Sequence, residues 1–204
     1  MIGWLKSSLS RRALFSTALA TGSVTAALAD TAHHDGHMTT SGEVDNGRNG
    51  FDPHHMLTDW DTGTLSQRAD GRPIRDFTIT AIDREIEIAP NLIFPAWTYN
   101  GRVPGPTLRV TEGDIVRIRF DNQGSHDHNI HFHGIHSPQM DGMPGVGEVE
   151  PGGSFLYEFE AQPFGCHLYH CHANPLRRHI HKGLYGAFIV DPDPARHPEL
   201  ESTA

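Results

Sequence analysis

One cysteine in this sequence stands between two histidines, in the segment His170-Cys171-His172. In a β-strand, neighbouring side chains point to opposite faces, so Cys171 would face one side while His170 and His172 share the other. A thiolate and imidazoles are ligands for copper or zinc. One strand could therefore serve two metal sites, an arrangement that favours copper over a single zinc ion.

A second group of histidines repeats this alternation before residue 134. His131 and His133 have the same parity, whereas His128 has the opposite parity and can join Cys171 on the inner side. A thiolate with two imidazoles forms the trigonal site typical of blue copper, usually with a weak fourth ligand. We expect the second imidazole from residues 175–183. Two histidines are available there, His179 and His181. The four remaining histidines of the two groups can line the outer side: His131, His133, His170 and His172.

The elements that must position these ligands are short strands. Runs of β-branched and aromatic residues at a period of two are separated by Gly, Pro and Asn. Seven such runs predict a Greek-key β-sandwich, an all-β fold, as one domain over residues 51–204. The predicted strands are 77–82, 85–89, 107–111, 115–120, 155–159, 166–171 and 184–190, with a brief helix at 175–182 and an exposed terminus from residue 191.

Cys166 and His167 also lie in the predicted strand that contains Cys171. The two cysteines are five residues apart, so their side chains would point to opposite faces and a disulfide between them is not expected. We interpret Cys166 as a small buried residue and His167 as an inward-facing histidine that is not a ligand. His126 and His136 are either loop residues or side chains that support the metal ligands, and we favour the loop interpretation.

Composition excludes some partners. The chain has 204 residues, 16 of them His, and a formal net charge of −9. An acidic chain without a basic stripe has no electrostatic reason to bind nucleic acid. No segment after residue 29 is long and apolar enough to span a bilayer, so the mature protein is expected to have no membrane segment.

The N-terminal residues have the composition of an export signal. Arg11 and Arg12 stand directly before a mildly apolar run, and Ala27-Leu28-Ala29 is a small-residue cleavage signal. Residues 1–29 resemble a twin-arginine signal peptide, which predicts a periplasmic or secreted protein. Residues 30–50 are predicted to be a flexible, His-rich tail containing His33, His34 and His37.

Three motifs resemble the cupredoxin domain of multicopper oxidases, over about residues 52–191. They are Trp97-Thr98-Tyr99-Asn100-Gly101-Arg102-Val103-Pro104-Gly105-Pro106-Thr107, His131-Phe132-His133-Gly134 and His170-Cys171-His172, and the segment 182–190, KGLYGAFIV, is a further match. By this resemblance the type 1 copper is held by His128, Cys171 and His179, with His181 as a substitute for His179. Leu184 takes the axial position, where a side chain that cannot coordinate raises the reduction potential.

The resemblance also implies a trinuclear copper cluster. His131 would bind its type 2 copper, and His133, His170 and His172 would bind its type 3 coppers. That cluster needs eight histidines and one chain supplies four, so we expect it to lie between subunits of a homo-oligomer, either a two-fold dimer or a trimer. Dioxygen and a small reducing substrate, a phenol or a metal ion, would be its partners in the reaction. Asp141 is a candidate proton donor.

Two other functions share these residues. Copper nitrite reductases resemble the chain around His128, His133, His170 and Cys171, but that family has an acidic residue at the position of His131 and lacks a histidine at that of His172. A non-enzymatic electron carrier or copper-storage protein is the third possibility. The copper content separates them: about 2.5 per chain for an oxidase with a two-fold cluster, about two for a nitrite reductase and about one for a carrier.

Overall fold

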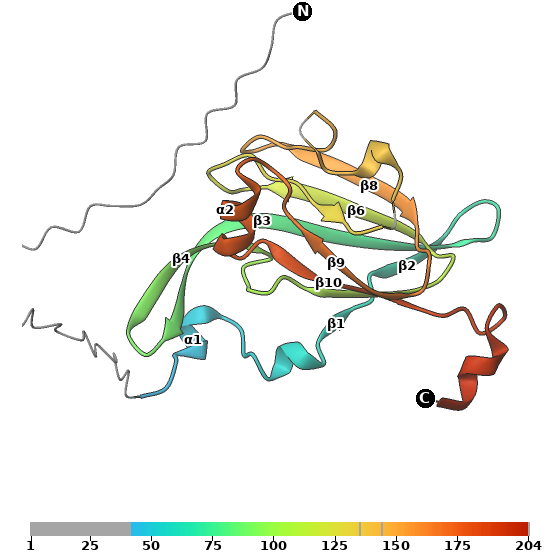
Figure 1. Cartoon of the computed structure of the whole chain (residues 1–204), viewed down its shortest axis with the longest axis horizontal. Helices are drawn as coiled ribbons and strands as arrows, with labels where there is room; N and C mark the ends of the chain where they lie inside the picture. The colour runs from blue at the N-terminus through green and yellow to red at the C-terminus, as the bar shows by residue number, and fades with distance from the viewer. Residues whose placement is uncertain (1–41, 135, 144, 204) are drawn as a thin grey trace, which may run out of the picture. The chain divides into compact units, whose positions relative to one another are not determined.

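The computed structural model describes residues 42–134, 136–143 and 145–203 (Figure 1). The predicted signal peptide and the tail histidines His33, His34 and His37 lie outside the described residues. In the part of the chain that is described, no helix is both long enough and apolar enough to cross a membrane.

The predicted β-sandwich is confirmed, with two sheets of five strands each (Figure 1). Sheet A has the order β1 (Trp60–Asp61), β5 (Thr107–Thr111), β10 (Tyr185–Asp191), β9 (Gly165–His170), β7 (His131–Phe132). Sheet B has the order β2 (Thr64–Gln67), β3 (Pro73–Ala89), β6 (Ile115–Asn122), β8 (Ser154–Glu160), and β4 (Leu92–Tyr99) also pairs with β3. The helices are α1 (Asn46–Asn49) and α2 (Leu176–Lys182), with 3-10 turns η1 (His55–Leu57), η2 (Pro138–Met140) and η3 (Pro198–Thr203).

Two predicted strands, 77–82 and 85–89, are one continuous strand. β3 runs from Pro73 to Ala89; its first half pairs with β6 and its second half with β4. No Gly or Pro interrupts the strand between the two runs, so the chain has no reason to turn there. The sequence did not predict β4 as a strand because Pro95 lies within it; β4 pairs only with β3, and such an edge strand tolerates a residue without a backbone N–H.

Aromatic residues from both sheets fill the core and fix which side of β9 faces inward. The ring of Phe132 in β7 lies 5.6 Å from that of Tyr169 in β9 and 5.7 Å from that of Phe188 in β10. The buried Tyr169 hydroxyl donates a hydrogen bond to the carbonyl oxygen of Pro106 at 2.6 Å. Gly186 pairs with Tyr169 across the sheet, and a Cβ there would collide with the tyrosine ring. Because Tyr169 is locked inside, Cys171, two residues later, also faces inward.

The end of the predicted flexible tail is part of the folded unit, so the prediction for residues 30–50 is wrong over residues 42–50. The Asp45 side chain caps α1 by accepting a hydrogen bond from the Arg48 backbone N–H at 2.9 Å. Asn49 is buried, and its side-chain amide pairs with both backbone groups of Glu87 in β3, at 2.8 and 3.0 Å. A polar side chain, rather than apolar burial, anchors this segment, which explains why hydropathy gave no signal.

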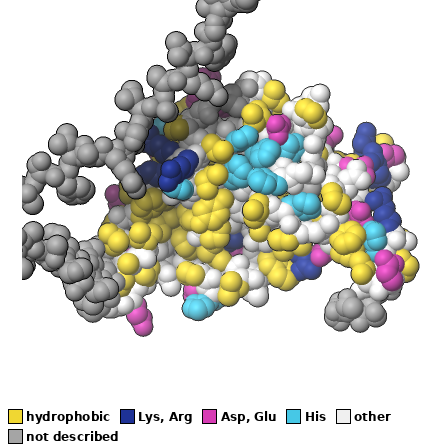
Figure 2. All heavy atoms as spheres, in the orientation of Figure 1, with side chains coloured by type: hydrophobic (Ala, Val, Ile, Leu, Met, Phe, Trp, Pro, Cys, Tyr) yellow, Lys and Arg dark blue, Asp and Glu magenta, His cyan; other side chains and the backbone are white. Residues whose placement is uncertain are grey.

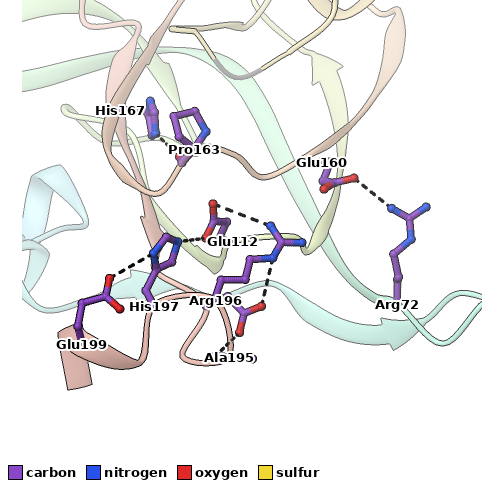
Figure 3. Close-up of polar contacts among 10 residues, drawn as sticks. Arg72, Glu112, Glu160, Pro163, His167, Ala195, Arg196, His197 and Glu199 are labelled. Carbon is purple, nitrogen blue, oxygen red and sulfur yellow. Dashed lines mark hydrogen bonds and ion pairs between the residues drawn. The ribbon is translucent and has the colours of Figure 1, made fainter. Parts of the chain in front are cut away.

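Most described residues after β10 are exposed, as predicted, but the segment is attached to the sandwich. His197 Nε2 lies 2.9 Å from Glu112 Oε2 in the turn after β5 (Figure 3), and its ring lies 4.6 Å from that of Phe164. Arg196 lies 3.9 Å from the same glutamate. These contacts attach the chain after β10 to the β5–β6 turn and to the loop before β9.

Candidate metal centre

Three potential ligands meet in the interior at one end of the sandwich, and we call them the inner site: His128, Cys171 and His179. His128 Nδ1 lies 3.2 Å from His179 Nδ1, and Cys171 Sγ lies 3.2 Å from His179 Nδ1 and 3.8 Å from His128 Nδ1. At most 2% of each residue is exposed. The three donor atoms thus converge on one buried point, as the parity of the two histidine groups predicted.

Each ligand of the inner site comes from a different element with its own backbone anchor. His128 precedes β7 and exchanges two backbone hydrogen bonds with Val149, at 3.0 and 2.8 Å. Cys171 directly follows β9, and its N–H donates to the carbonyl oxygen of Leu184 at 3.0 Å. His179 lies in α2, the only α-helix after β9 in the described residues. The site is therefore assembled by the fold rather than by one local motif.

The donor set of the inner site fits a copper ion. The atoms that face one another are two imidazole nitrogens and one sulfur, His128 Nδ1, His179 Nδ1 and Cys171 Sγ, and potential ligand atoms of the three residues lie within 4.8 Å of one another. Burial lowers the pKa of His128 to about 4, so its imidazole is neutral and keeps the lone pair that a metal needs. Burial raises the pKa of the Cys171 thiol to about 11, so metal binding must displace its proton. A thiolate with two imidazoles is the donor set of blue copper.

The structure places His179, and not His181, next to the Cys171 thiol. The two histidines are two positions apart on α2, and His181 is exposed on the other side of the helix. Leu184, the predicted axial residue, is fully buried, and its N–H donates to the His179 carbonyl oxygen at 3.3 Å. Its backbone is thus bonded to both Cys171 and His179, whereas its axial role stays a prediction.

Four histidines meet on the opposite face of the same strand, and we call them the outer site: His131, His133, His170 and His172. Cross-strand pairing places His131 opposite His170. His133 Nε2 lies 2.8 Å from His170 Nε2, and ligand atoms of His131, His133 and His170 lie within 4.8 Å of one another. His172 joins through its ring, 4.8 Å from that of His131. Figure 2 shows histidine side chains gathered on this face of the molecule.

The outer histidines are basic groups that share a small space. Burial lowers the pKa of His133, His170 and His172, and repulsion from neighbouring imidazoles lowers them further. His172 Nδ1 is buried and has no hydrogen-bond partner. Neutral imidazoles with unpaired nitrogens are what a cluster of metal ions would require.

Asp141 lies beside the outer site, as its predicted role requires. Its Oδ1 is 2.9 Å from His131 Nδ1 and 3.5 Å from Nε2 of His136. His136 lies in a loop, as the favoured interpretation has it, and its side chain is largely buried beside Asp141, where its Nε2 makes no hydrogen bond. Its position next to the outer site, the other possibility that the sequence left open, depends on the turn at Pro138–Met140, which returns the chain to His131.

Two further residues that sequence reasoning did not single out hold the sites in place. Asn129 is fully buried, and its Oδ1 accepts a hydrogen bond from the His172 backbone N–H at 2.6 Å. Trp97 lies over the inner site, with its ring 5.3 Å from His128 and 4.8 Å from His179. The signal for Asn129 was present, because a polar residue between His128 and Ile130 in a buried segment needs a partner. Trp97 was noted only as part of a motif.

The remaining predictions on β9 have mixed outcomes. Both cysteines are free, and they face opposite sides as expected, but Cys166 is exposed rather than buried because it shares the parity of His170. His167 is partly exposed; its Nδ1 lies 3.3 Å from the His133 carbonyl oxygen and its Nε2 lies 2.9 Å from that of Pro163 (Figure 3). His167 therefore contacts the backbone of an outer-site residue and is not part of either group of ligands.

Comparison with known proteins gives one consistent family. Residues 84–195 match the family model described as multicopper oxidase. A copper resistance protein A homolog from Pseudomonas syringae pv. tomato is 35% identical over 133 residues, 64% of this chain and 21% of that protein. A crystal structure of a multicopper oxidase is 56% identical, with a TM-score of 0.71, over 74% of this chain and 53% of that chain.

A copper nitrite reductase from Nitrosomonas europaea is also similar. Its structure is 32% identical, with a TM-score of 0.53, over 60% of this chain and 43% of that chain. The chain spans about a fifth of the length of the curated relative and about half of the solved multicopper oxidase chain. The similarity therefore covers only part of each of these longer proteins.

Proposed function

Because this chain belongs to the multicopper oxidase family, whose members bind copper, we propose that it is a copper-dependent oxidase. It would couple one-electron oxidation of a reducing substrate at the inner site to four-electron reduction of dioxygen to water at the outer site. The observation that carries this proposal is the strand end at Cys171, with a thiol among two imidazoles on one face and four histidines on the other. The β-sandwich is of the cupredoxin kind.

The two sites divide the ligands by strand parity. His128, Cys171 and His179 would hold the type 1 copper, with Leu184 in the axial position. The outer ligands would be His131 for type 2 copper and His133, His170 and His172 for type 3. Bound copper ions would supply the redox chemistry, taking up single electrons inside and delivering them to dioxygen outside.

The chain itself supplies a short path between the two sites. His170 and His172 are the covalent neighbours of Cys171, so only one peptide unit separates the thiol-bearing residue from either imidazole. His170 Nδ1 also lies 2.9 Å from the Cys171 carbonyl oxygen, which belongs to the peptide that joins Cys171 to His172. Asn129 holds the His172 backbone through its hydrogen bond and follows His128 directly in sequence. Movement of either site is therefore restrained by the other.

Asp141 is suited to handle protons at the outer site. Reduction of dioxygen to water consumes protons as well as electrons, and a carboxylate 2.9 Å from His131 Nδ1 can deliver them there. The His131 nitrogen also lies 2.9 Å from the Asp141 carbonyl oxygen, so the turn fixes the orientation of the ring. We propose Asp141 as the proton donor.

We propose that a second copy of this chain completes the outer site. Four histidines are half of the ligands of a trinuclear cluster, and they lie on the outward face of sheet A, beside the loop that contains Asp141. The same face exposes Leu168 of β9 and Tyr185 of β10, which pairs with His170. Large apolar side chains beside unpaired ligands are expected at a subunit interface.

We also propose that residues 1–29 direct the protein to the periplasm by the twin-arginine route.

Copper content, mass in solution and oxygen uptake test this function together. The protein loaded with copper should be a homo-oligomer, bind about 2.5 copper ions per chain if the cluster is two-fold, and consume oxygen with a simple phenol. A monomer with about one copper per chain and no oxygen uptake would refute the oxidase and leave an electron carrier. A His131→Ala variant is the matched control, because it should lose outer copper and oxygen uptake but keep the blue colour of the inner site.

Nitrite reduction is the second candidate, favoured by the similarity to copper nitrite reductases. His131 and His172 oppose it, because that family does not have histidines at these two positions. The same preparation distinguishes them: about two coppers per chain with nitrite consumption would favour the reductase.

A further inference from the structure

Two adjoining cavities lie beside α2, and together we call them the α2 pocket. One has a volume of about 780 Å³ and extends towards α1; the other, of about 910 Å³, extends along the exposed side of α2. Four residues line both: Phe94, His181, Lys182 and Tyr185. A pocket of this size can hold a small organic molecule.

The wall of the α2 pocket is apolar and partly aromatic. Phe94 of β4 and Tyr185 of β10 contribute rings, and the floor includes Ile86, Ala96 and Val103. Figure 2 shows a broad hydrophobic area next to a group of Lys and Arg side chains on this side of the molecule. A flat aromatic molecule would bury its ring against such a wall.

The rim of the pocket at α2 is cationic, although the chain as a whole is acidic. Residues 174–182 contain three permanent cations, Arg177, Arg178 and Lys182, and no carboxylate, in a chain with a net charge of −9. None of the three forms an ion pair within the described residues. Lys182 donates to the Pro95 carbonyl oxygen at 2.6 Å; Asp83 and Glu85 line a further cavity with it, but neither forms an ion pair with it. An anion is the ligand that this rim favours.

Two carboxylates line the other end of the first cavity, and neither cancels this charge. Glu87 is largely buried, and its two oxygens accept hydrogen bonds from the backbone N–H groups of Asp45 and Asn91, at 3.0 and 2.5 Å. Glu43 is exposed to solvent on the far wall. The charge of the pocket is thus graded, positive at α2 and negative at α1, which would orient a ligand with one anionic end.

The α2 pocket and the inner site share one helix and one ring. His179 faces the inner site from α2, while Lys182 lines the pocket from the same helix. Trp97 packs between them, with its ring 4.8 Å from the His179 ring and 5.8 Å from Lys182 Nζ. Only packed side chains, Trp97 among them, would separate a molecule bound at Lys182 from His179, the proposed copper ligand.

We propose that the α2 pocket binds the electron donor and that this donor is a small phenol carrying a carboxylate. The inference rests on the proposed function and names its substrate class. The carboxylate would bind at Lys182 and Arg177, and the ring would lie on Phe94 and Tyr185. Metal cations, the other class of donor that the sequence left open, are repelled by this rim.

The chemistry of such a donor balances with the proposed reaction. Each phenol gives up one electron and its hydroxyl proton and becomes a phenoxyl radical. Four such oxidations supply the four electrons and four protons that convert one dioxygen into two water molecules. The carboxylate is unchanged, because it serves only for binding.

Calorimetry on the copper-loaded protein tests the binding step without turnover, because benzoate has no phenolic hydroxyl to oxidise. Benzoate should bind about tenfold more tightly than the neutral benzamide, as expected for one charge-assisted hydrogen bond. An Arg177→Gln/Lys182→Gln variant should lose this preference, and Arg177→Gln alone, at an exposed position, should lose part of it. The matched control Arg68→Gln removes an exposed arginine outside the pocket and should change nothing. Equal affinities for benzoate and benzamide would overturn the proposal.

Measurements of oxygen uptake then test the substrate class separately from the oxidase function. The substrates are a methoxyphenol that carries a carboxylate and the corresponding amide. The Arg177→Gln/Lys182→Gln variant should have an about tenfold higher KM for the acid and an unchanged KM for the amide. Oxidation of the amide as efficiently as the acid by the unmodified protein would refute the substrate class while the oxidase function stands. No oxygen uptake with either phenol would refute the oxidase and, with it, the role of the pocket as a donor site, whatever calorimetry shows about carboxylate binding.

Discussion

Asn129 connects the inner and outer sites, and its replacement by alanine should destabilise the protein measurably. The substitution leaves the His172 backbone N–H, whose bond to Asn129 Oδ1 is 2.6 Å long, without an acceptor. An unsatisfied buried group costs about 1–3 kcal/mol. Asn129 Nδ2 is itself buried without a partner, so its removal recovers part of that cost. We therefore expect a loss of about 1.5 kcal/mol, which lowers the melting temperature by about 3–6 °C in a domain of this size.

Thermal unfolding of the metal-free protein, followed by circular dichroism, measures this loss without a contribution from bound copper. Gln123→Ala is the matched control, because Gln123 is an exposed amide near the end of β6 and its loss should change stability by less than about 0.5 kcal/mol. If Asn129→Ala melts at the same temperature as the unmodified protein, the hydrogen bond to His172 does not stabilise the fold and the coupling of the two sites through Asn129 is wrong.

The other predictions concern copper and turnover. Cys171→Ser should remove one copper per chain and the blue absorption while outer copper remains, and metal analysis that finds unchanged copper would contradict a thiolate ligand. His179→Ala should lose the same copper, whereas His181→Ala should keep both the copper and the blue spectrum because its side chain lies on the exposed side of α2. Asp141→Asn should leave copper content unchanged and slow oxygen uptake by about 100-fold, and an unchanged rate would exclude Asp141 as the proton donor. Removal of copper with a chelator should abolish oxygen uptake and lower the melting temperature, since a metal bound only by the folded state stabilises it; equal melting temperatures with and without copper would argue against a preformed metal site.

Strand parity made the candidate site predictable from the sequence. Consecutive side chains of a strand alternate strictly, so the positions of His170, Cys171 and His172 relative to one another needed no tertiary information. The same rule put His128 on the side of Cys171. The same alternation places Cys166 on the face of His170, and it overrides the average burial of cysteine, on which the prediction of a buried Cys166 rested.

The choice between His179 and His181 required the helix. In α2 two positions two residues apart are rotated by more than half a turn, so only one of them can face the thiol. The sequence places cations and histidines all around this short helix, and no apolar stripe marks its inner face. The β-sandwich covers His179. This contact between segments far apart in sequence determines that His179, not His181, lies next to the thiol.

The residues around the sites were the least predictable, because loops place them. His136 and Asp141 contact His131 from a short turn. Trp97 contacts His179 from β4, an edge strand that was not predicted because it contains Pro95. The contact of Trp97 with His179 joins segments far apart in sequence, which periodicity does not encode. His136 and Asp141 lie within ten residues of His131, but only the conformation of their loop brings them to it. The C-terminal contact of His197 with Glu112 is of the same kind, 85 residues apart.

The two sites have different surroundings, which is why we expect only the outer site to depend on a partner. The inner site lies where sheets A and B close on each other, and backbone hydrogen bonds from Leu184 and Val149 fix its ligands from within one chain. The outer site uses the opposite parity of the same strand, so its ligands necessarily point away from that core. In the described residues, the loop that contains His136 and Asp141 covers part of the outer site, and no further β-sheet lies over it. If the outer site is half of a trinuclear cluster, as we propose, the other half must come from another molecule, whether the copies form a dimer or a trimer.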